Sequence, residues 1–219
     1  MMKKTVFVIV ILLIVLASGC KIENLGGIKG SGNVKTESRN VSGFKEIKAE
    51  NAVELEITVQ KDFSLTIEAD DNLLDQVRTE VSGNTLKIST RDSITSKNKI
   101  KVKVSLPDLT DLDLSGASTA NVSGVKTDSL KLNANGASRI KIDGEVKSVD
   151  ATASGASGVD AENLKTENAK ANASGASHIT VSPTGDLNAE ASGASTVTYT
   201  VEPKSIKQNA SGASTIKKK

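Results

Sequence analysis

The side chains that could carry chemistry are few in this sequence, and their types do not form a reactive set. His178 is the only histidine and Cys20 the only cysteine among the 219 residues. One isolated histidine supports neither a Ser–His–Asp arrangement nor a metal site built from histidine and cysteine. The acidic pairs Asp70–Asp71 and Asp111–Asp113 are candidates for binding a cation, but with 25% charged residues we expect such pairs to be solvated. We therefore expect no catalytic residue, no cofactor and no metal site.

Cys20 follows a stretch with the features of a cleaved signal peptide, residues 1–19. Lys3 and Lys4 provide a positive start, residues 6–16 are an unbroken apolar run, and residues 17–19 are small. The run is shorter than the roughly 20 residues that a spanning helix needs. Leu-Ala-Ser-Gly-Cys at the end of this stretch resembles the lipobox of bacterial lipoproteins, which implies cleavage before Cys20 and lipid attachment to its sulfur. The alternative is an ordinary secretory signal with a cysteine at its end by chance.

The mature chain is then expected to be tethered to a membrane. Residues 20–33 would comprise the lipidated cysteine and a flexible glycine-rich tether. Burial of acyl chains contributes about 0.8 kcal/mol per CH₂, so more than one chain gives a lasting anchor. Lys21 is not the aspartate that retains Gram-negative lipoproteins at the inner membrane. The outer membrane is therefore a better expectation than the cytoplasmic membrane.

A recurring tetrapeptide organises the second half of the chain. Ser-Gly-Ala-Ser, or Asn-Gly-Ala-Ser in one copy, occurs six times, at intervals that are similar but not identical. A period of about 19 residues is typical of a solenoid, in which one supersecondary unit stacks on itself. We expect the glycines to occupy corners of successive coils, where the chain changes direction. They are Gly116, Gly136, Gly155, Gly175, Gly193 and Gly212.

Alignment on these glycines predicts which positions face the core. Aliphatic residues recur two, four and six residues before the glycine and four and six residues after it, as expected for strands with one inward face. Alanine follows the glycine directly in every copy, and we expect it to point inward at a narrow corner. Serine comes next, and we expect its hydroxyl to bind corner backbone groups. Because only 2% of residues are aromatic and none is tryptophan, the core must be thin.

Residues 34–110 form the predicted N-terminal β-strand part, and residues 111–219 the regular coils. Period-two alternation of apolar and polar residues marks strands at 53–59, 65–69 and 100–106. Gly-Ser-Gly-Asn-Val at 30–34, Ile-Glu-Ala-Asp-Asp-Asn-Leu-Leu at 67–74, and Val-Ser-Leu-Pro at 104–107 leading into the first repeat together resemble the head GIN domain of autotransporter adhesins. The resemblance implies an all-β fold, a right-handed parallel β-helix over roughly residues 30–216. It also implies an envelope setting and adhesion, and it carries no catalytic motif.

The sequence thus favours a membrane-anchored, non-enzymatic envelope lipoprotein that serves adhesion, ligand binding or structure. Removal of residues 1–19 leaves 26 basic and 26 acidic residues, and this balance argues against nucleic acid as a partner. Expected partners are the membrane, through the lipid, and an extracellular glycan or protein.

Two other functions are compatible with the repeats. A polysaccharide lyase or hydrolase on the same scaffold would use basic residues such as Arg139 and Lys141, although the aromatic sugar platforms are nearly missing. An ice-binding solenoid would need a flat threonine array, which Arg139, Gly158 and His178 interrupt.

Overall fold

The computed structural model describes residues 27–91 and 93–219, and Cys20 with its signal peptide lies outside this part. The described chain consists of strands and one short 3₁₀ segment, η1 (Asp71–Gln76). The strands are β1 (Ile28–Lys29), β2 (Val34–Ser38), β3 (Glu46–Ala49), β4 (Val53–Val59), β5 (Ser64–Asp70), β6 (Val77–Ser82), β7 (Thr85–Thr90), β8 (Ile94–Thr95), β9 (Ile100–Leu106), β10 (Asp111–Leu114), β11 (Thr119–Ala134), β12 (Arg139–Gly155), β13 (Gly158–Gly175), β14 (His178–Pro183), β15 (Asp186–Ala191), β16 (Thr196–Tyr199), β17 (Ser205–Ala210) and β18 (Thr215–Lys218).

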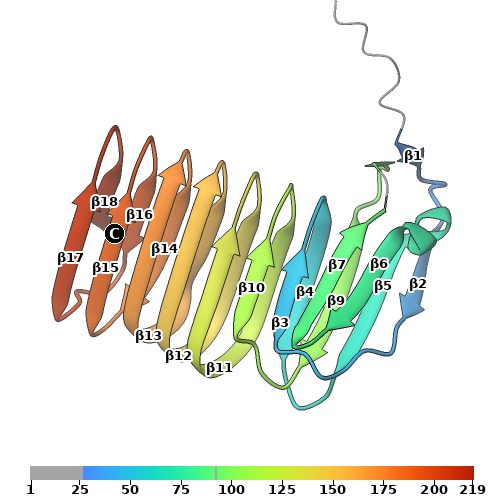
Figure 1. The fold of residues 1–219 in the computed structure, drawn as a ribbon, viewed down its shortest axis with the longest axis horizontal. Helices are drawn as coiled ribbons and strands as arrows, with labels where there is room; N and C mark the ends of the chain where they lie inside the picture. The colour runs from blue at the N-terminus through green and yellow to red at the C-terminus, as the bar shows by residue number, and fades with distance from the viewer. Residues whose placement is uncertain (1–26, 92) are drawn as a thin grey trace, which may run out of the picture.

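These strands wind into a β-solenoid. In Figure 1 the chain rises through the near strands, crosses at the top and descends behind them while advancing toward the C-terminus, which is a right-handed winding. Strands of successive coils pair in parallel, so that Leu132 lies beside Ala151, Ala151 beside Ala171, and Ala171 beside Ala189. The predicted all-β solenoid, in which the repeated tetrapeptide marks successive coils, is confirmed.

The solenoid interior is a thin aliphatic layer in which small and large side chains compensate. In the coil that begins with β10, Leu112 and Leu114 share the interior with Ala120, and all three are at most 2% exposed. In a later coil the order is reversed, with Ala171 and Ala173 sharing the interior with the larger Ile179. The thickness therefore stays nearly constant from coil to coil, as close packing requires. Toward the N-terminal end an aromatic ring, that of Phe44, is fully buried in the core, and its centroid lies 5.1 Å from that of the Phe63 ring.

The corners differ from the sequence prediction in one respect. The alanine that follows each corner glycine is exposed, and the serine after it is buried in the first five repeats and partly buried in the last. The prediction of an inward alanine was wrong, because the corner backbone turns the side chain two residues after the glycine into the core. Each buried hydroxyl bonds a backbone carbonyl of its own or the preceding coil, as Ser157 does with Ala134 O at 2.8 Å and Ser154 O at 2.9 Å. The other serines of this ladder are Ser118, Ser138, Ser177, Ser195 and Ser214.

Glycine is required at the corners for two reasons. All six predicted glycines have φ between 73° and 82°, a left-handed conformation that side chains disfavour. The corners also stack closely. A Cβ on Gly155, for example, would stand 2.7 Å from the carbonyl oxygen of Gly136 in the coil below. That same oxygen accepts a hydrogen bond from Ala156 N at 2.7 Å, so the coils cannot separate to make room.

The N-terminal coils do not stack in sequence order. The coil formed by β3 and β4 lies between the coil of β7 and β9 and the first repeat coil, because β3 pairs with both β7 and β10. Asn51 occupies its corner with φ 78°, the position that glycine takes in the repeats. At the N-terminal end, antiparallel β5, β6 and β2 and the buried Leu73 of η1 close the core. We call these elements the N-terminal cap.

Residues 28–33, predicted to belong to a flexible tether, are bound to the N-terminal cap. β1 pairs with β8, and Ser31 Oγ donates a hydrogen bond to Asp71 Oδ1 at 2.6 Å. Asn72 Nδ2 bonds the carbonyl of Lys29 at 2.8 Å. Gly30 is a packing residue here, because a Cβ would overlap the Asp70 carboxylate. This part of the predicted tether is therefore held by specific hydrogen bonds.

Enlargement of a buried alanine should test the column assignment. Ala173 is 3% exposed and lies between Ala153 and Ala191, so Ala173→Leu should reduce the free energy of unfolding by about 1–3 kcal/mol through overpacking. Lys170→Ala, on the outer surface of the same strand, should change it by less than about 0.5 kcal/mol. Chemical denaturation measures both values. Equal losses would show that the inward columns are misassigned.

Candidate functional site

A long groove follows the lower bends of the solenoid, opposite the glycine corners. It has a volume of about 880 Å³ and crosses five successive chain passages. We call it the bend groove. It is lined by Lys126, Thr127, Asp128, Glu145, Val146, Lys147, Glu162, Asn163, Lys165, Thr166, Glu167, Ser182, Thr184, Thr200, Val201 and Lys204.

The bend groove lies where successive coils contain different numbers of residues. The strands on both sides of the corners stay in register, but the pairing shifts between Val122 and Val125 and again between Asp160 and Lys165. At each shift one passage contains more residues than its neighbour, so the backbone paths differ at the bend. The uneven spacing of the corner glycines is the sequence signal of these shifts. The uneven glycine spacing is visible in the sequence, but by itself it does not predict a ligand-binding groove at the bends.

The floor of the bend groove is closed by hydroxyl groups that bond the backbone. Thr166 is 4% exposed, and its Oγ1 donates to Asn168 O at 2.9 Å. Ser182 is 8% exposed, contacts Thr200 Oγ1 at 2.5 Å and lies 2.6 Å from Glu162 O. Because these hydroxyls already have partners, they fix the shape of the floor. Val201, which is 42% exposed, adds an apolar wall near the C-terminal end.

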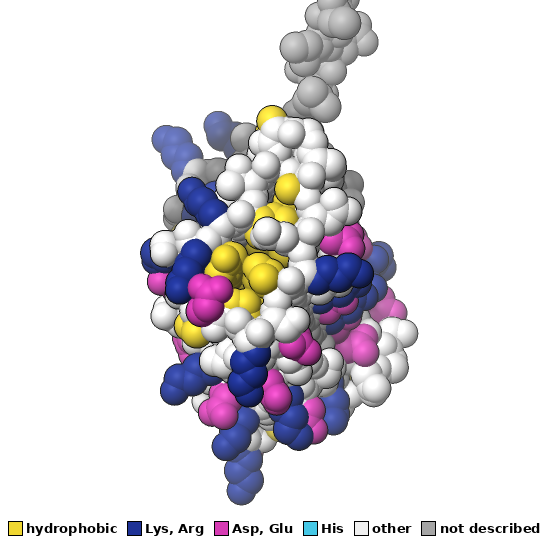
Figure 2. All heavy atoms as spheres, turned by 90° about the vertical axis from the view of Figure 1, so that its left-hand side faces the viewer, with side chains coloured by type: hydrophobic (Ala, Val, Ile, Leu, Met, Phe, Trp, Pro, Cys, Tyr) yellow, Lys and Arg dark blue, Asp and Glu magenta, His cyan; other side chains and the backbone are white. Residues whose placement is uncertain are grey.

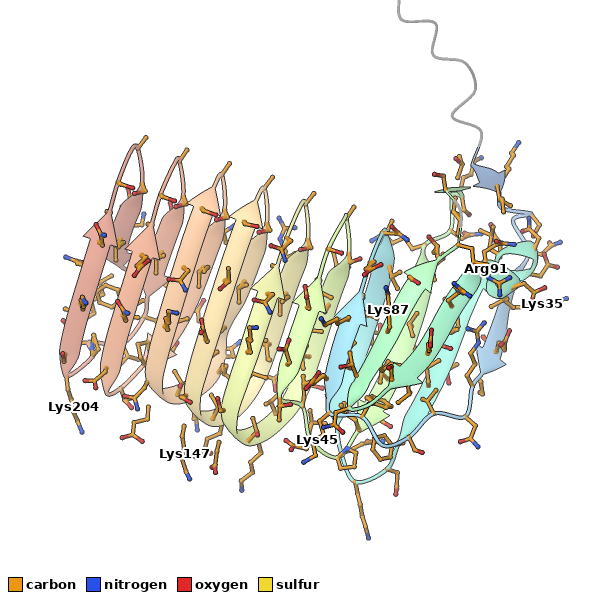
Figure 3. The ribbon with its side chains drawn as sticks, in the orientation of Figure 1. Lys35, Lys45, Lys87, Arg91, Lys147 and Lys204 are labelled. Carbon is orange, nitrogen blue, oxygen red and sulfur yellow. The ribbon has the colours of Figure 1, made fainter. Side chains whose placement is uncertain are left out.

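The rim of the bend groove carries charges of both signs. Four lysines face four acidic residues among the lining side chains. Lys147 Nζ lies 2.8 Å from Asp128 Oδ1, and this hydrogen bond raises the pKa of the Lys147 ammonium group. Figure 3 shows Lys147 and Lys204 projecting outward from the lower bends, with Lys45 on the same side nearer the N-terminus. The exposed ion pair contributes little to stability, so these side chains are available to a ligand.

This arrangement can bind and orient a polar ligand, but it holds no reactive set. The groove offers ammonium donors, carboxylate acceptors and one exposed aliphatic wall. No aromatic side chain lines it, and no group of acidic, histidine or cysteine residues with metal-site geometry occurs within residues 27–91 and 93–219. A rigid, largely preformed groove of this size is a typical ligand site.

A second hollow, of about 560 Å³, lies near the upper corners at the N-terminal end. Asn51, Arg91, Asn98 and Lys99 are among its lining residues. Residue 92, which follows Arg91 in the sequence, lies outside the described residues. The bend groove is therefore the better-defined candidate.

The candidate residues from the sequence lie apart from the bend groove. His178 is exposed, and its imidazole lies over Gly158 in the preceding coil. Arg139 and Lys141 are exposed on β12, beside Gly158 and Asp160 of β13, and neither lines the groove. None of the six corner glycines lines the bend groove. The structure therefore brings none of the sequence candidates together at this site.

The two acidic pairs differ in their surroundings. Asp70 is 1% exposed, against the expectation of solvation, because it accepts hydrogen bonds from Ser96 Oγ and Asn98 Nδ2, both at 2.6 Å. The Ser96 bond, helped by Asn98, lowers the pKa of the Asp70 carboxyl group, and Ser31 lowers that of Asp71. Burial raises the pKa of Asp111, although Lys131 opposes this effect. Asp70 thus has a structural role, holding the loop that contains β8 against the N-terminal cap.

The comparisons with known proteins establish the family. Residues 43–203 match the family described as "Putative auto-transporter adhesin, head GIN domain", and the chain belongs to this family. The comparison with curated proteins found no significant match.

Solved structures share the fold. A crystal structure described as a "putative adhesin" from Bacteroides fragilis superposes with a TM-score of 0.75 at 22% identity, covering 88% of this chain and 100% of that one. A "putative adhesin" from Parabacteroides merdae gives 0.56 at 17% identity, covering 88% and 98%. A "Putative lipid binding protein" from Parabacteroides distasonis gives 0.54 at 20% identity, covering 88% and 99%. At these identities the similarity shows the fold alone. No helix in the described part of this chain is long and apolar enough to cross a bilayer.

The buried Asp70 should make the N-terminal cap sensitive to acid. Because its folded-state pKa is lowered, Asp70 stabilises the fold above the ordinary carboxyl value, and this contribution is lost as the pH falls below about 4. Asp70→Asn should lower the unfolding midpoint by several degrees at pH 7 and by much less at pH 3. Asp75→Asn, an exposed change on η1, is the control. Thermal melts that show an equal loss at both pH values would contradict this role.

Proposed function

We propose that this protein is a lipid-anchored, non-enzymatic envelope protein that binds an extended polar ligand, a glycan strand or a protein segment, along the bend groove. The single observation that carries the proposal is the groove itself, because it crosses five chain passages on a rigid scaffold. Membership of an adhesin-head family supports a binding role at the cell surface.

The shape of the bend groove favours a long ligand over a compact one. Successive coils of a solenoid are about 4.8 Å apart, so similar donors and acceptors recur along the axis. Lys126, Lys147 and Lys165 stand on three neighbouring passages and present such a row. A chain molecule can use several of these weak contacts at once, which a small molecule cannot.

The charges of the groove favour a ligand without a large net charge. Equal numbers of lysines and acidic residues line it, so a strongly anionic polymer would meet carboxylates as well as ammonium groups. This balance separates the proposed ligand from nucleic acid and from polyuronides, the substrates expected of a lyase. Binding should therefore depend on specific donors more than on the overall field.

Charge reversal in the bend groove should strongly reduce ligand capture. The full chain with Lys147→Glu and Lys204→Glu should bind at least about tenfold less ligand than wild type, a loss of about 1.4 kcal/mol of binding free energy. Binding to a glycan panel and capture of ligand from intact envelopes measure this difference. A glycan hit or a captured protein decides the ligand class.

Lys131→Glu with Lys170→Glu is the matched control, because these lysines are exposed on β11 and β13 and do not line the bend groove. Capture that is unchanged in the groove variant, or equally reduced in the control, would argue against the groove. Turnover of any glycan in the panel would favour the alternative, a lyase or hydrolase.

The structure is compatible with an anchor close to the N-terminal cap. Residues 28–33 are bound there, and Gly27 lies seven residues after Cys20. Seven residues reach at most about 25 Å. A lipid on Cys20 would therefore hold the N-terminal end near the bilayer, and the C-terminal coils would lie farther away.

Removal of the proposed lipid attachment site should release the protein. Cys20→Ser in the full chain should move most of it from the membrane fraction to the soluble fraction, because no acyl chain remains to be buried. Lys21→Asp, which keeps the cysteine, should stay in the membrane and serves as the control. Fractionation followed by mass spectrometry of the N-terminal peptide measures both. A Cys20→Ser protein that stays in the membrane would disprove the lipid anchor.

A further inference from the structure

The two ends of the solenoid are finished differently. At the N-terminal end the cap covers the aliphatic layer, and Leu73 and Val77 are at most 2% exposed. At the C-terminal end the last described coil, β17 and β18, has no described strand beyond it. Among the described strands, β17 pairs only with β15, and β18 only with β16. Two strand edges therefore present unpaired backbone groups at the same end.

The inward side chains of the last described coil are covered by a described coil on one side only. They continue the core columns, since Ile206 follows Leu187, Gln208 follows Ala189, and Ile216 follows Val197. Ile206 is 38% exposed and Val201 is 42% exposed, and both lie at this end. Figure 2 shows an apolar patch in the middle of this end, with charged side chains around it. Such an end is suited to pairing with further strands.

We propose that this end binds the same end of a second copy of the chain through antiparallel pairing of β17 with β17 and of β18 with β18. A two-fold axis perpendicular to the solenoid axis would produce both pairings at once, since it reverses the strands and keeps each sheet on its own side. Gln208 lies four residues before the corner Gly212 and Ile216 lies four residues after it. The two residues therefore stand at about the same height, and one axis can pass through both.

The sequence of the last coil is complementary to itself in this register. With Gln208 opposite Gln208 of the second copy, the inward Ile206 meets Ala210, and the outward Lys207 meets Asn209. On the other sheet, Ile216 meets Ile216 in the interior, and the outward Lys217 meets Thr215. No lysine stands directly opposite a lysine. On the two-fold axis, Gln208 meets Gln208 of the second copy on one sheet, and Ile216 meets Ile216 of the second copy on the other.

Lysines at open edges normally discourage pairing, and here they select the register. A shift of one residue away from the corner would place Lys207 opposite Lys207 and Lys217 opposite Lys217, which like charges disfavour. A shift of one residue toward the corner would move Ile206 opposite Gly212 and lose its apolar contact. Lys218 and Lys219 are already paired with Glu202 at 2.9 Å and Glu162 at 2.6 Å. The remaining charges are thus compatible with one register.

The paired ends would form a double-length rod with an N-terminal cap at each end. If Cys20 holds each cap at a membrane, the two copies come from two facing membranes, and this consequence rests on the function proposed above. The pairing itself does not depend on the anchor. The contact is small, about ten strand residues from each copy, so we expect weak association that covalent capture can detect.

Cysteine cross-linking tests the pairing and its register. Gln208→Cys in the full chain, in detergent extracts of membranes, should form a disulfide-linked dimer under mild oxidation, because directly opposite residues have Cα atoms about 4.5–5.5 Å apart, within disulfide range. Asn209→Cys should cross-link at least about tenfold less, since its copy lies two residues further along, at about 8 Å. The wild-type chain is the control for any disulfide-linked dimer that forms through Cys20.

A second substitution separates pairing from chance collision. Ile216→Lys added to Gln208→Cys should abolish the dimer, while Val34→Lys, at an exposed apolar site at the N-terminal end, should leave it intact. No dimer with Gln208→Cys, equal cross-linking of Asn209→Cys, or a disulfide to a different protein would each overturn the proposal. Differently tagged cells, mixed before oxidation, should yield dimers that carry both tags. Dimers only within one population would overturn membrane bridging and leave the pairing intact.

Discussion

Hydrogen bonding between coils is the constraint on which the rest of this structure depends. Each coil satisfies its backbone through the coils above and below, so every coil must follow nearly the same path as its neighbours. The corners show how tight this requirement is, because Ala156 N bonds Gly136 O at 2.7 Å and a Cβ on Gly155 would collide with that oxygen. Glycine and the buried serine hydroxyl recur there because stacking leaves no alternative geometry.

Variation is confined to the places where this constraint is weakest. The strands beside the corners hold their register, whereas the lower bends contain the shifts between Val122 and Val125 and between Asp160 and Lys165. The bend groove lies along these shifts, lined by charged side chains over a floor of satisfied hydroxyls. A fold that repeats rigidly on one side thus obtains a variable, ligand-sized surface on the other, which suits a binding protein of the adhesin-head family.

The ends of a solenoid need a separate solution, because an end coil has a neighbour on one side only. At the N-terminal end the chain departs from sequence order and folds antiparallel strands and η1 over the core, with Asp70 fastening the adjacent loop. At the C-terminal end of the described chain, Ile206 is exposed and Ile216 is only partly buried. This asymmetry connects the architecture to the proposed contact with a second copy.

The sequence by itself determined the solenoid, its period and the positions of its corners, because parallel stacking requires similar residues at equivalent positions of successive coils. It also indicated which strand positions face the core. Only the tertiary structure decided that the alanine beside each glycine faces water, that Asn51 forms a further corner, and that Asp70 is buried. The physical reason is that these features arise from the turn of the corner backbone and from contacts between residues distant in the chain, which no local pattern records. The bend groove belongs to the second group as well, since it appears only when coils of unequal length are stacked side by side.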